Sequence, residues 1–202
     1  MHAKRFTAPL AGIGLALAAL PALAEDIHPT SALIGNEATN EIRGWLASPL
    51  VELSIVAQNR KTANLTEEQI LALDKQWRAE TKTADQPLIA ATLNNPLSAY
   101  LTQIQAASEG LYTEIFVMDA KGLNVGQSAI TTDFWQGDEA KFQKTFPSGS
   151  GAVFVDAEEF DKDLKSWKAQ IHLTISGADN APIGAITVEY NLTELARRRA
   201  AL

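Results

Sequence analysis

The character of the chain changes near residue 110, and this change restricts its fold more than any other feature. Before it, apolar residues recur at helical spacings, as Ile42, Leu46 and Leu53 do. After it, short segments rich in β-branched and aromatic residues alternate with turn residues. The links between these segments are too short for parallel crossovers, so we expect antiparallel pairing. The sequence therefore predicts an α+β fold, in which long N-terminal helices pack on a five-stranded antiparallel sheet.

Local signals divide the first part of the chain into separate helices. Pro49 interrupts the first helical pattern, because proline lacks an amide donor and crowds the preceding turn. Thr66 and Gln69 have the spacing of a capping box, in which each side chain accepts a hydrogen bond from the other residue's backbone amide. Asn95 can cap a further helix, with Pro96 in the first helical position. We therefore expect several helices rather than one long rod.

Turn residues set the order of elements in the second part. Gly122 ends a turn in which it is free to adopt positive φ. A short helix is expected at 137–146, with Asp138 and Glu139 in its first turn, where the helix dipole favours acidic side chains. The helices must cover one sheet face, and the segment 131–149 is expected to cover the other. The expected strands are 111–118, 123–130, 152–156, 166–175 and 183–190, followed by a terminal helix at 192–202.

The first 24 residues read as a secretory signal peptide. Lys4 and Arg5 provide the positive start, an apolar stretch follows, and Ala22-Leu23-Ala24 is a small-x-small cleavage site. The apolar stretch is shorter than the roughly 20 residues of a spanning helix, and no second one follows, so we expect a periplasmic protein with no membrane span after cleavage. The expected division is a signal peptide at 1–24, a tail at 25–40 and a single domain at 41–202, with a helical part (41–109), a sheet part (111–190) and a C-terminal helix (192–202).

Composition argues against several classes of function. The net charge of −7 repels phosphate backbones, so nucleic acid is not an expected partner. The chain has no cysteine, which rules out disulfides and thiolate chemistry. The acidic stretch 156–163 lacks the glycine and the terminal glutamate of an EF-hand loop, which favours a solvated connection over a calcium site. Because histidine clusters and phosphate-binding loops are also missing, we expect no catalytic residues, no metal and no cofactor.

Three stretches of the chain carry a family resemblance. The first runs from Trp45 to Asn59 and continues at 73–80, the second is 115–122, and the third is 132–139 with the late strand 182–188. Together they resemble the single Cache (PAS-like, also called PDC) extracytoplasmic sensor domains, over nearly the whole chain after the signal peptide. The resemblance implies a PAS-like sheet and a pocket for a small molecule such as an organic acid or an amine. Since no output domain is visible, it implies a freestanding periplasmic form that signals through a separate membrane receptor or kinase.

Two residues near the implied pocket stand out. Trp135 could form a pocket wall, because indole offers a large apolar face and one donor, or it could simply pack onto the sheet. Asp133 could pair with a cationic ligand, or it could be a turn residue that bonds to its own backbone. The pattern alone leaves both alternatives open.

Strand parity assigns further candidates to sheet faces. It places Tyr112 on the same face as Phe116 and Met118. His172 has the opposite parity to the apolar residues around it, so it contacts a ligand if its face is the pocket side, and is an ordinary surface residue if that face meets solvent. The solvent-facing alternative is favoured. The candidate ligand contacts are Trp135, Asp133, Gln136, Tyr112, Phe154, Asp156 and His172.

Two functions from different classes follow. The first is a non-enzymatic periplasmic sensor module that binds a small molecule between the sheet and residues 131–149. The alternative is a ligand-free structural or interaction protein with a Cache fold, which forms a homodimer through its helices. A pocket filled by the chain's own side chains would favour the second.

Overall fold

The computed structural model describes residues 28–201, so the expected signal peptide lies outside the described residues. Within this range no helix is long and apolar enough to cross a membrane. The helices are the short 3₁₀ helix η1 (Ser31–Leu33), α1 (Asn36–Leu46), α2 (Pro49–Thr62), α3 (Glu67–Glu80), α4 (Pro87–Leu93), α5 (Pro96–Ala107), α6 (Ala140–Gln143), the 3₁₀ helix η2 (Phe146–Ser148) and α7 (Leu192–Ala200).

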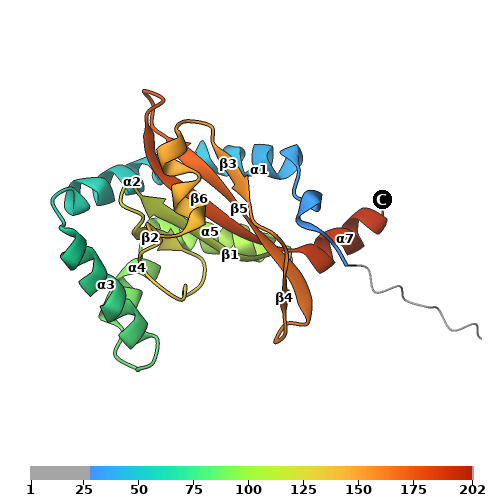
Figure 1. The fold of residues 1–202 in the computed structure, drawn as a ribbon, viewed down its shortest axis with the longest axis horizontal. Helices are drawn as coiled ribbons and strands as arrows, with labels where there is room; N and C mark the ends of the chain where they lie inside the picture. The colour runs from blue at the N-terminus through green and yellow to red at the C-terminus, as the bar shows by residue number, and fades with distance from the viewer. Residues whose placement is uncertain (1–27, 202) are drawn as a thin grey trace, which may run out of the picture.

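The strands form one antiparallel sheet, as the sequence predicts. They are β1 (Tyr112–Asp119), β2 (Asn124–Gln127), β3 (Val153–Val155), β4 (Glu159–Asp161), β5 (Ser166–Ser176) and β6 (Pro182–Asn191). Their order is β2-β1-β6-β5-β3, with β4 paired to β5 off this path. The α+β class is therefore confirmed, and β4 is a strand that the sequence did not reveal. Figure 1 shows β4 and the start of β5 projecting beyond the rest of the sheet.

One face of the sheet is a packed apolar layer. Helices α1, α2 and α5 contribute Ile42, Ile55 and Leu97, which meet Ile115 of β1 and Ile186 of β6. All five side chains are fully buried. Complete burial of such a side chain contributes roughly 1.5–3 kcal/mol, so this face supplies much of the stability.

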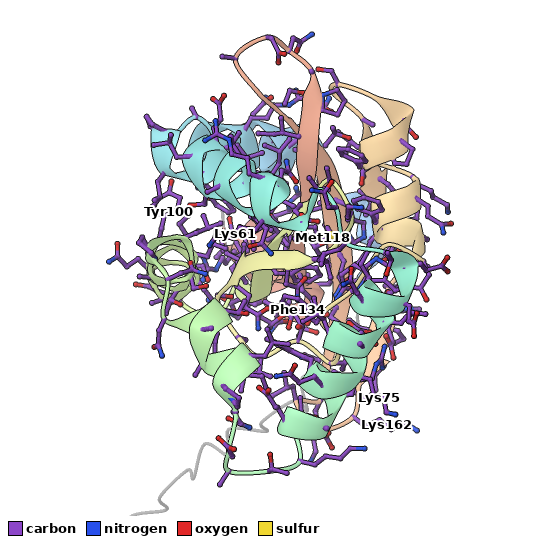
Figure 2. All side chains as sticks on the ribbon, turned by 90° about the vertical axis from the view of Figure 1, so that its left-hand side faces the viewer. Lys61, Lys75, Tyr100, Met118, Phe134 and Lys162 are labelled. Atoms are coloured by element: carbon purple, nitrogen blue, oxygen red, sulfur yellow. The ribbon has the colours of Figure 1, made fainter. Side chains whose placement is uncertain are left out.

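The segment after β2 covers the other face, which confirms the expectation for residues 131–149. Phe142 and Phe146, from the α6–η2 segment, pack against Phe116 and Met118 of β1 and Ala185 of β6. In Figure 2 this segment (pale orange) and helices α1 and α2 (blue) lie on opposite sides of the sheet, with Met118 between them. Both faces of the sheet are thus occupied.

Helices α3 and α4 form a second, smaller core with the loop after β2. Trp77 of α3 is fully buried and stacks on Phe134, with ring centroids 5.3 Å apart. Its indole Nε1 donates to the Thr131 carbonyl oxygen at 2.9 Å. Figure 2 shows Phe134 among these elements. This core anchors the loop 131–136 to α3.

The local signals for the helix boundaries are confirmed. Helix α2 begins at Pro49, after a break of two residues. Thr66 and Gln69 form the complete capping box. The Asn95 side chain accepts from the Ser98 amide at 2.9 Å. These motifs succeed because each satisfies backbone donors that a helix start leaves free.

Two expectations need correction. Helix α1 begins at Asn36, and Ile34 and Ala38 belong to the main core, so the expected tail at 25–40 ends too late. The helix expected at 137–146 shrinks to α6, and Asp138 and Glu139 precede it instead of forming its first turn. The residues directly before α6 form a turn instead, in which the Glu139 amide donates to the Gln136 carbonyl oxygen at 3.0 Å.

Candidate functional site

A cavity of about 320 Å³ opens on the second face of the sheet. It lies between strands β1, β5 and β6 and the loop 130–141 that precedes and enters α6. Small-molecule sites commonly occupy roughly 300–1,000 Å³. The lining consists of Thr113, Glu114, Phe116, Ile130, Thr131, Thr132, Asp133, Gln136, Lys141, Leu164, Lys168, Gln170 and Glu189.

Two glutamates face each other on the strand side of the cavity. Glu114 of β1 and Glu189 of β6 are direct cross-strand partners. Glu189 is well supplied with donors: Thr113 Oγ1 at 2.7 Å and Gln170 Nε2 at 3.0 Å. The side chain of Glu114 makes no hydrogen bond or ion pair within residues 28–201. Burial, together with the Glu189 charge, raises the pKa of Glu114 to about 7.

Both lysines of the cavity are already paired with carboxylates. Lys141 Nζ lies 3.1 Å from Glu139 Oε2. Lys168 Nζ lies 3.6 Å from Asp161 Oδ2 and 3.5 Å from Glu189 Oε2. The cations of the cavity are therefore engaged, whereas the Glu114 carboxylate is not.

The loop side of the cavity contributes Asp133 and Gln136. Asp133 accepts from Arg78 Nη2 at 3.0 Å and from Gln136 Nε2 at 2.5 Å. Gln136 is 1% exposed, and its Oε1 has no hydrogen-bond partner in the described chain. A buried amide oxygen without a donor is costly, and this oxygen has almost no accessible surface, so its hydrogen-bonding capacity stays unmet. The structure thus brings both of these sequence candidates to the cavity.

A buried polar cluster behind the loop was missed in the sequence. Asn124 Nδ2 donates to Gln127 Oε1 at 3.1 Å and to Thr131 Oγ1 at 2.9 Å. Asn124 Oδ1 and Gln127 Nε2 are themselves without partners among the described residues. The available signal was the polarity of β2, where amide side chains occupy a short strand that is buried along its whole length. Of this cluster, only Thr131 reaches the cavity lining.

The rim of the cavity is apolar. Ile130 follows β2, and Leu164 lies in the turn after β4. Their side chains are 47% and 63% exposed, respectively. Large apolar side chains at the edge of a polar hollow are typical of a surface that a ligand covers.

His172, Phe154 and Asp156 lie together beyond the main cavity. His172 is fully buried, so the favoured solvent-facing alternative is wrong: its face is the covered one. Its Nδ1 lies 2.9 Å from Thr187 Oγ1 and its Nε2 lies 3.1 Å from Asp156 Oδ2. The ring stacks on Phe154 at 5.5 Å. Burial lowers the pKa of His172 against the opposing effect of Asp156, so the ring is neutral at pH 7.

Asp156 also lines a smaller hollow of about 230 Å³. This hollow shares Lys141, Lys168, Gln170 and Glu189 with the main cavity, so the two hollows adjoin. The hydrogen bond to His172 lowers the pKa of Asp156, which keeps this carboxylate ionised. Phe154 and His172 support this wall without lining either hollow.

The structure places Trp135 and Tyr112 away from the cavity. The Trp135 indole Nε1 donates to the Lys121 carbonyl oxygen at 2.8 Å, and the ring packs beside the small core of α3 and α4. Tyr112 packs against the helices, where its hydroxyl donates to Glu41 Oε1 at 2.8 Å. A shift of register in β1 between Tyr112 and Glu114 reverses the parity, so the prediction that Tyr112 shares a face with Phe116 is wrong.

Among residues 28–201, no group of three or more histidine, aspartate or glutamate side chains is placed to hold a metal ion. The chemistry that the cavity offers is binding: carboxylates, amide groups and an apolar rim.

The comparisons with known proteins return sensor domains. No protein-family model matches the chain, and no curated protein matches it. Among solved structures, the ligand-binding domain of the Pseudomonas aeruginosa PAO1 amino-acid chemoreceptor PctC, in complex with GABA, is 14% identical, with a TM-score of 0.40 over 80% of this chain and 62% of that chain. The sensory domain of the Campylobacter jejuni chemoreceptor Tlp3 is 16% identical, with a TM-score of 0.40 over 83% and 66%.

A histidine kinase is also among the similar structures. The sensor domain of V. cholerae DctB is 15% identical, with a TM-score of 0.38 over 83% of this chain and 58% of that chain. These neighbours are described as ligand-binding or sensor domains of chemoreceptors and of a histidine kinase. The chain spans about 62% of the PctC domain. The fold class itself rests on the strand order and helix placement described above.

Proposed function

We propose that this chain is a non-enzymatic periplasmic sensor module, which binds a small molecule between the sheet and residues 131–149 and signals through a separate partner protein. The observation that carries the proposal is the open cavity of about 320 Å³, whose lining includes the side chain of Glu114, which has no hydrogen-bond or ion-pair partner within residues 28–201. The cavity is not filled by the chain's own side chains, which favours a sensor over a ligand-free interaction protein.

The contacts of the cavity loop supply a route for a signal. Asp74 of α3 accepts from the Phe134 amide at 2.9 Å, and Arg78 of the same helix holds Asp133. Ligand contacts with Asp133 or Gln136 would therefore favour one position of the loop and, through it, one position of α3. A ligand that prefers one such arrangement shifts the population towards it. The partner, a membrane receptor or kinase, would recognise that arrangement.

The ligand class of the proposal is a small metabolite. The neighbour PctC is described in complex with GABA, and Tlp3 domains in complex with amino-acid-like compounds. For the present chain, amines, organic acids and amino acids of similar size are the compounds to screen.

A thermal-shift screen of the purified protein tests the proposal. A ligand at about 100 times its dissociation constant adds roughly 2.7 kcal/mol to the stability of the folded state. Gln170→Trp places a large ring in the cavity from strand β5 and should abolish any ligand-induced shift. Leu53→Trp, at a position on α2 that is 68% exposed, is the matched control and should leave the shift intact. A screen without any shift, or shifts that survive Gln170→Trp, would contradict the proposal.

A further inference from the structure

Glu114 has an unfavourable electrostatic environment on strand β1. It stands opposite Glu189 in the register of β1 and β6, and like charges directly opposite each other destabilise a sheet. Its side chain is only partly exposed, and ionisation there carries a desolvation cost. Within residues 28–201, no group donates a hydrogen bond to the Glu114 carboxylate or forms an ion pair with it. Lys141 and Lys168 act on Glu114 only from beyond ion-pair distance, so its carboxylate has no direct cationic partner.

The remaining charges of the cavity show which sign of ligand it lacks. Lys141 and Lys168 are held by Glu139, Asp161 and Glu189. An anionic ligand would have to displace one of these carboxylates and would add a further negative charge beside Glu114. A cationic ligand would meet a carboxylate that is free and would relieve its repulsion with Glu189.

We propose that the cavity recognises the ammonium group of an organic amine, which Glu114 binds as its counter-ion; this inference rests on the proposed function and names its ligand class. The ammonium donates three hydrogen bonds. The Glu114 carboxylate accepts the charge-assisted one, which is the strongest kind.

The apolar rim specifies the rest of the ligand. Ile130 and Leu164 are exposed members of the lining, and Phe116 is a further apolar member that is almost fully buried. These groups suit an aliphatic body and offer nothing to a hydrated metal ion. The ligand is therefore an amine with a short apolar chain.

The same geometry makes binding depend on pH. The charged groups that face Glu114 are Glu189 of β6, Lys168 of β5, Lys141 of α6 and Asp133 of the loop. With a pKa of about 7, the Glu114 carboxyl is mostly ionised at pH 8 and mostly protonated at pH 6. An alkylammonium stays protonated across this range, so its affinity should fall about tenfold from pH 8 to pH 6.

Calorimetry with two compounds of opposite charge and a similar branched body tests the inference. Isoamylamine should bind the purified protein at pH 8, and isocaproate should not. Glu114→Gln should weaken isoamylamine binding about tenfold and remove its pH dependence. Glu41→Gln changes a carboxylate on the opposite face of the sheet and is the matched control, with affinity and pH dependence unchanged.

The outcomes separate this inference from the proposed function. Isocaproate binding that Gln170→Trp abolishes would keep the sensor proposal and overturn the amine class. Isoamylamine binding that is equal in wild type and Glu114→Gln would also overturn it. If neither these compounds nor any member of the wider screen binds, both proposals fail together.

Discussion

The two faces of the sheet are built from the same strands but serve different ends. On β6, Ile186 points into the helix-covered core and is fully buried, whereas Glu189 points to the cavity. On β5, Leu173 belongs to the core and Gln170 to the cavity. Because strand side chains alternate between faces, one sequence can carry a stable layer and a polar binding layer at once. Stability and the proposed ligand recognition therefore depend on different residues of the same strands.

The largest expected effect is the loss of stability when a side chain of the apolar face is truncated. Ile186→Ala removes a fully buried side chain from the core between the sheet and the helices. It should lower the free energy of unfolding by about 3 kcal/mol, since the cavity left behind adds to the lost burial. Urea denaturation measures this change. Thr132→Ala, at an exposed position on the other face, is the control and should cost less than about 0.5 kcal/mol.

The second effect has the opposite sign, because the cavity face contains a group that opposes folding. Burial and Glu189 raise the pKa of Glu114 from 4.5 to about 7, so the folded state prefers the protonated form. Glu114 therefore does not destabilise the folded state below pH 4.5. The destabilisation grows as the pH rises and is complete above about pH 7. Glu114→Gln should therefore stabilise the protein at pH 8 by about 2–3 kcal/mol and have little effect at pH 4. Equal effects in urea denaturation at both pH values would contradict this account.

The sequence predicted the apolar face better than the cavity face. The helical pattern correctly points Ile42 and Leu46 to the core, because burial of large apolar residues is a local and repetitive signal, although Leu53 of the same pattern is 68% exposed. The caps at Thr66 and Asn95 are equally local. These features depend on neighbours in the sequence, so a single chain reveals them.

The cavity depends on contacts between distant segments, and there the sequence reached only part of the answer. Asp133 and Gln136 were predicted because they lie in the loop expected to cover the sheet. Glu114 was missed because its importance comes from its pairing with Glu189, 75 positions further along the chain. Tyr112 was misplaced because the register shift in β1 leaves no mark in the sequence pattern. For Trp135 the sequence left a pocket wall and simple packing both open, and the structure shows packing, with the indole donating to the Lys121 carbonyl oxygen.

A smaller effect is expected at Trp135 and tests whether this residue contributes to stability or to the cavity. Trp135→Phe keeps an aromatic ring beside the small core but removes the donor to the Lys121 carbonyl oxygen. The free energy of unfolding should fall by about 1 kcal/mol, while the affinity for a cavity ligand stays unchanged. Denaturation and calorimetry on one preparation measure both quantities. A loss of affinity with little loss of stability would return Trp135 to the ligand site.

The smallest expected effect concerns His172, a buried residue that bonds to Asp156 in the wall of the smaller hollow. Burial lowers the pKa of this imidazole below 6.5, so the folded state prefers the neutral ring. Stability from this group is complete above pH 6.5 and is lost as the pH falls towards the lowered pKa, which is the opposite direction to Glu114. Below pH 6.5 the loss from His172 is opposed by the gain from Glu114, whose contribution changes between pH 4.5 and about 7, so the test uses a Glu114→Gln background. In that background His172→Gln should remove the decline in stability that begins as the pH falls below 6.5, measured by urea denaturation. If the decline in acid persists in this variant, another group than His172 governs it, and the hydrogen bonds to Thr187 and Asp156 hold the ring without setting the acid limit of the fold.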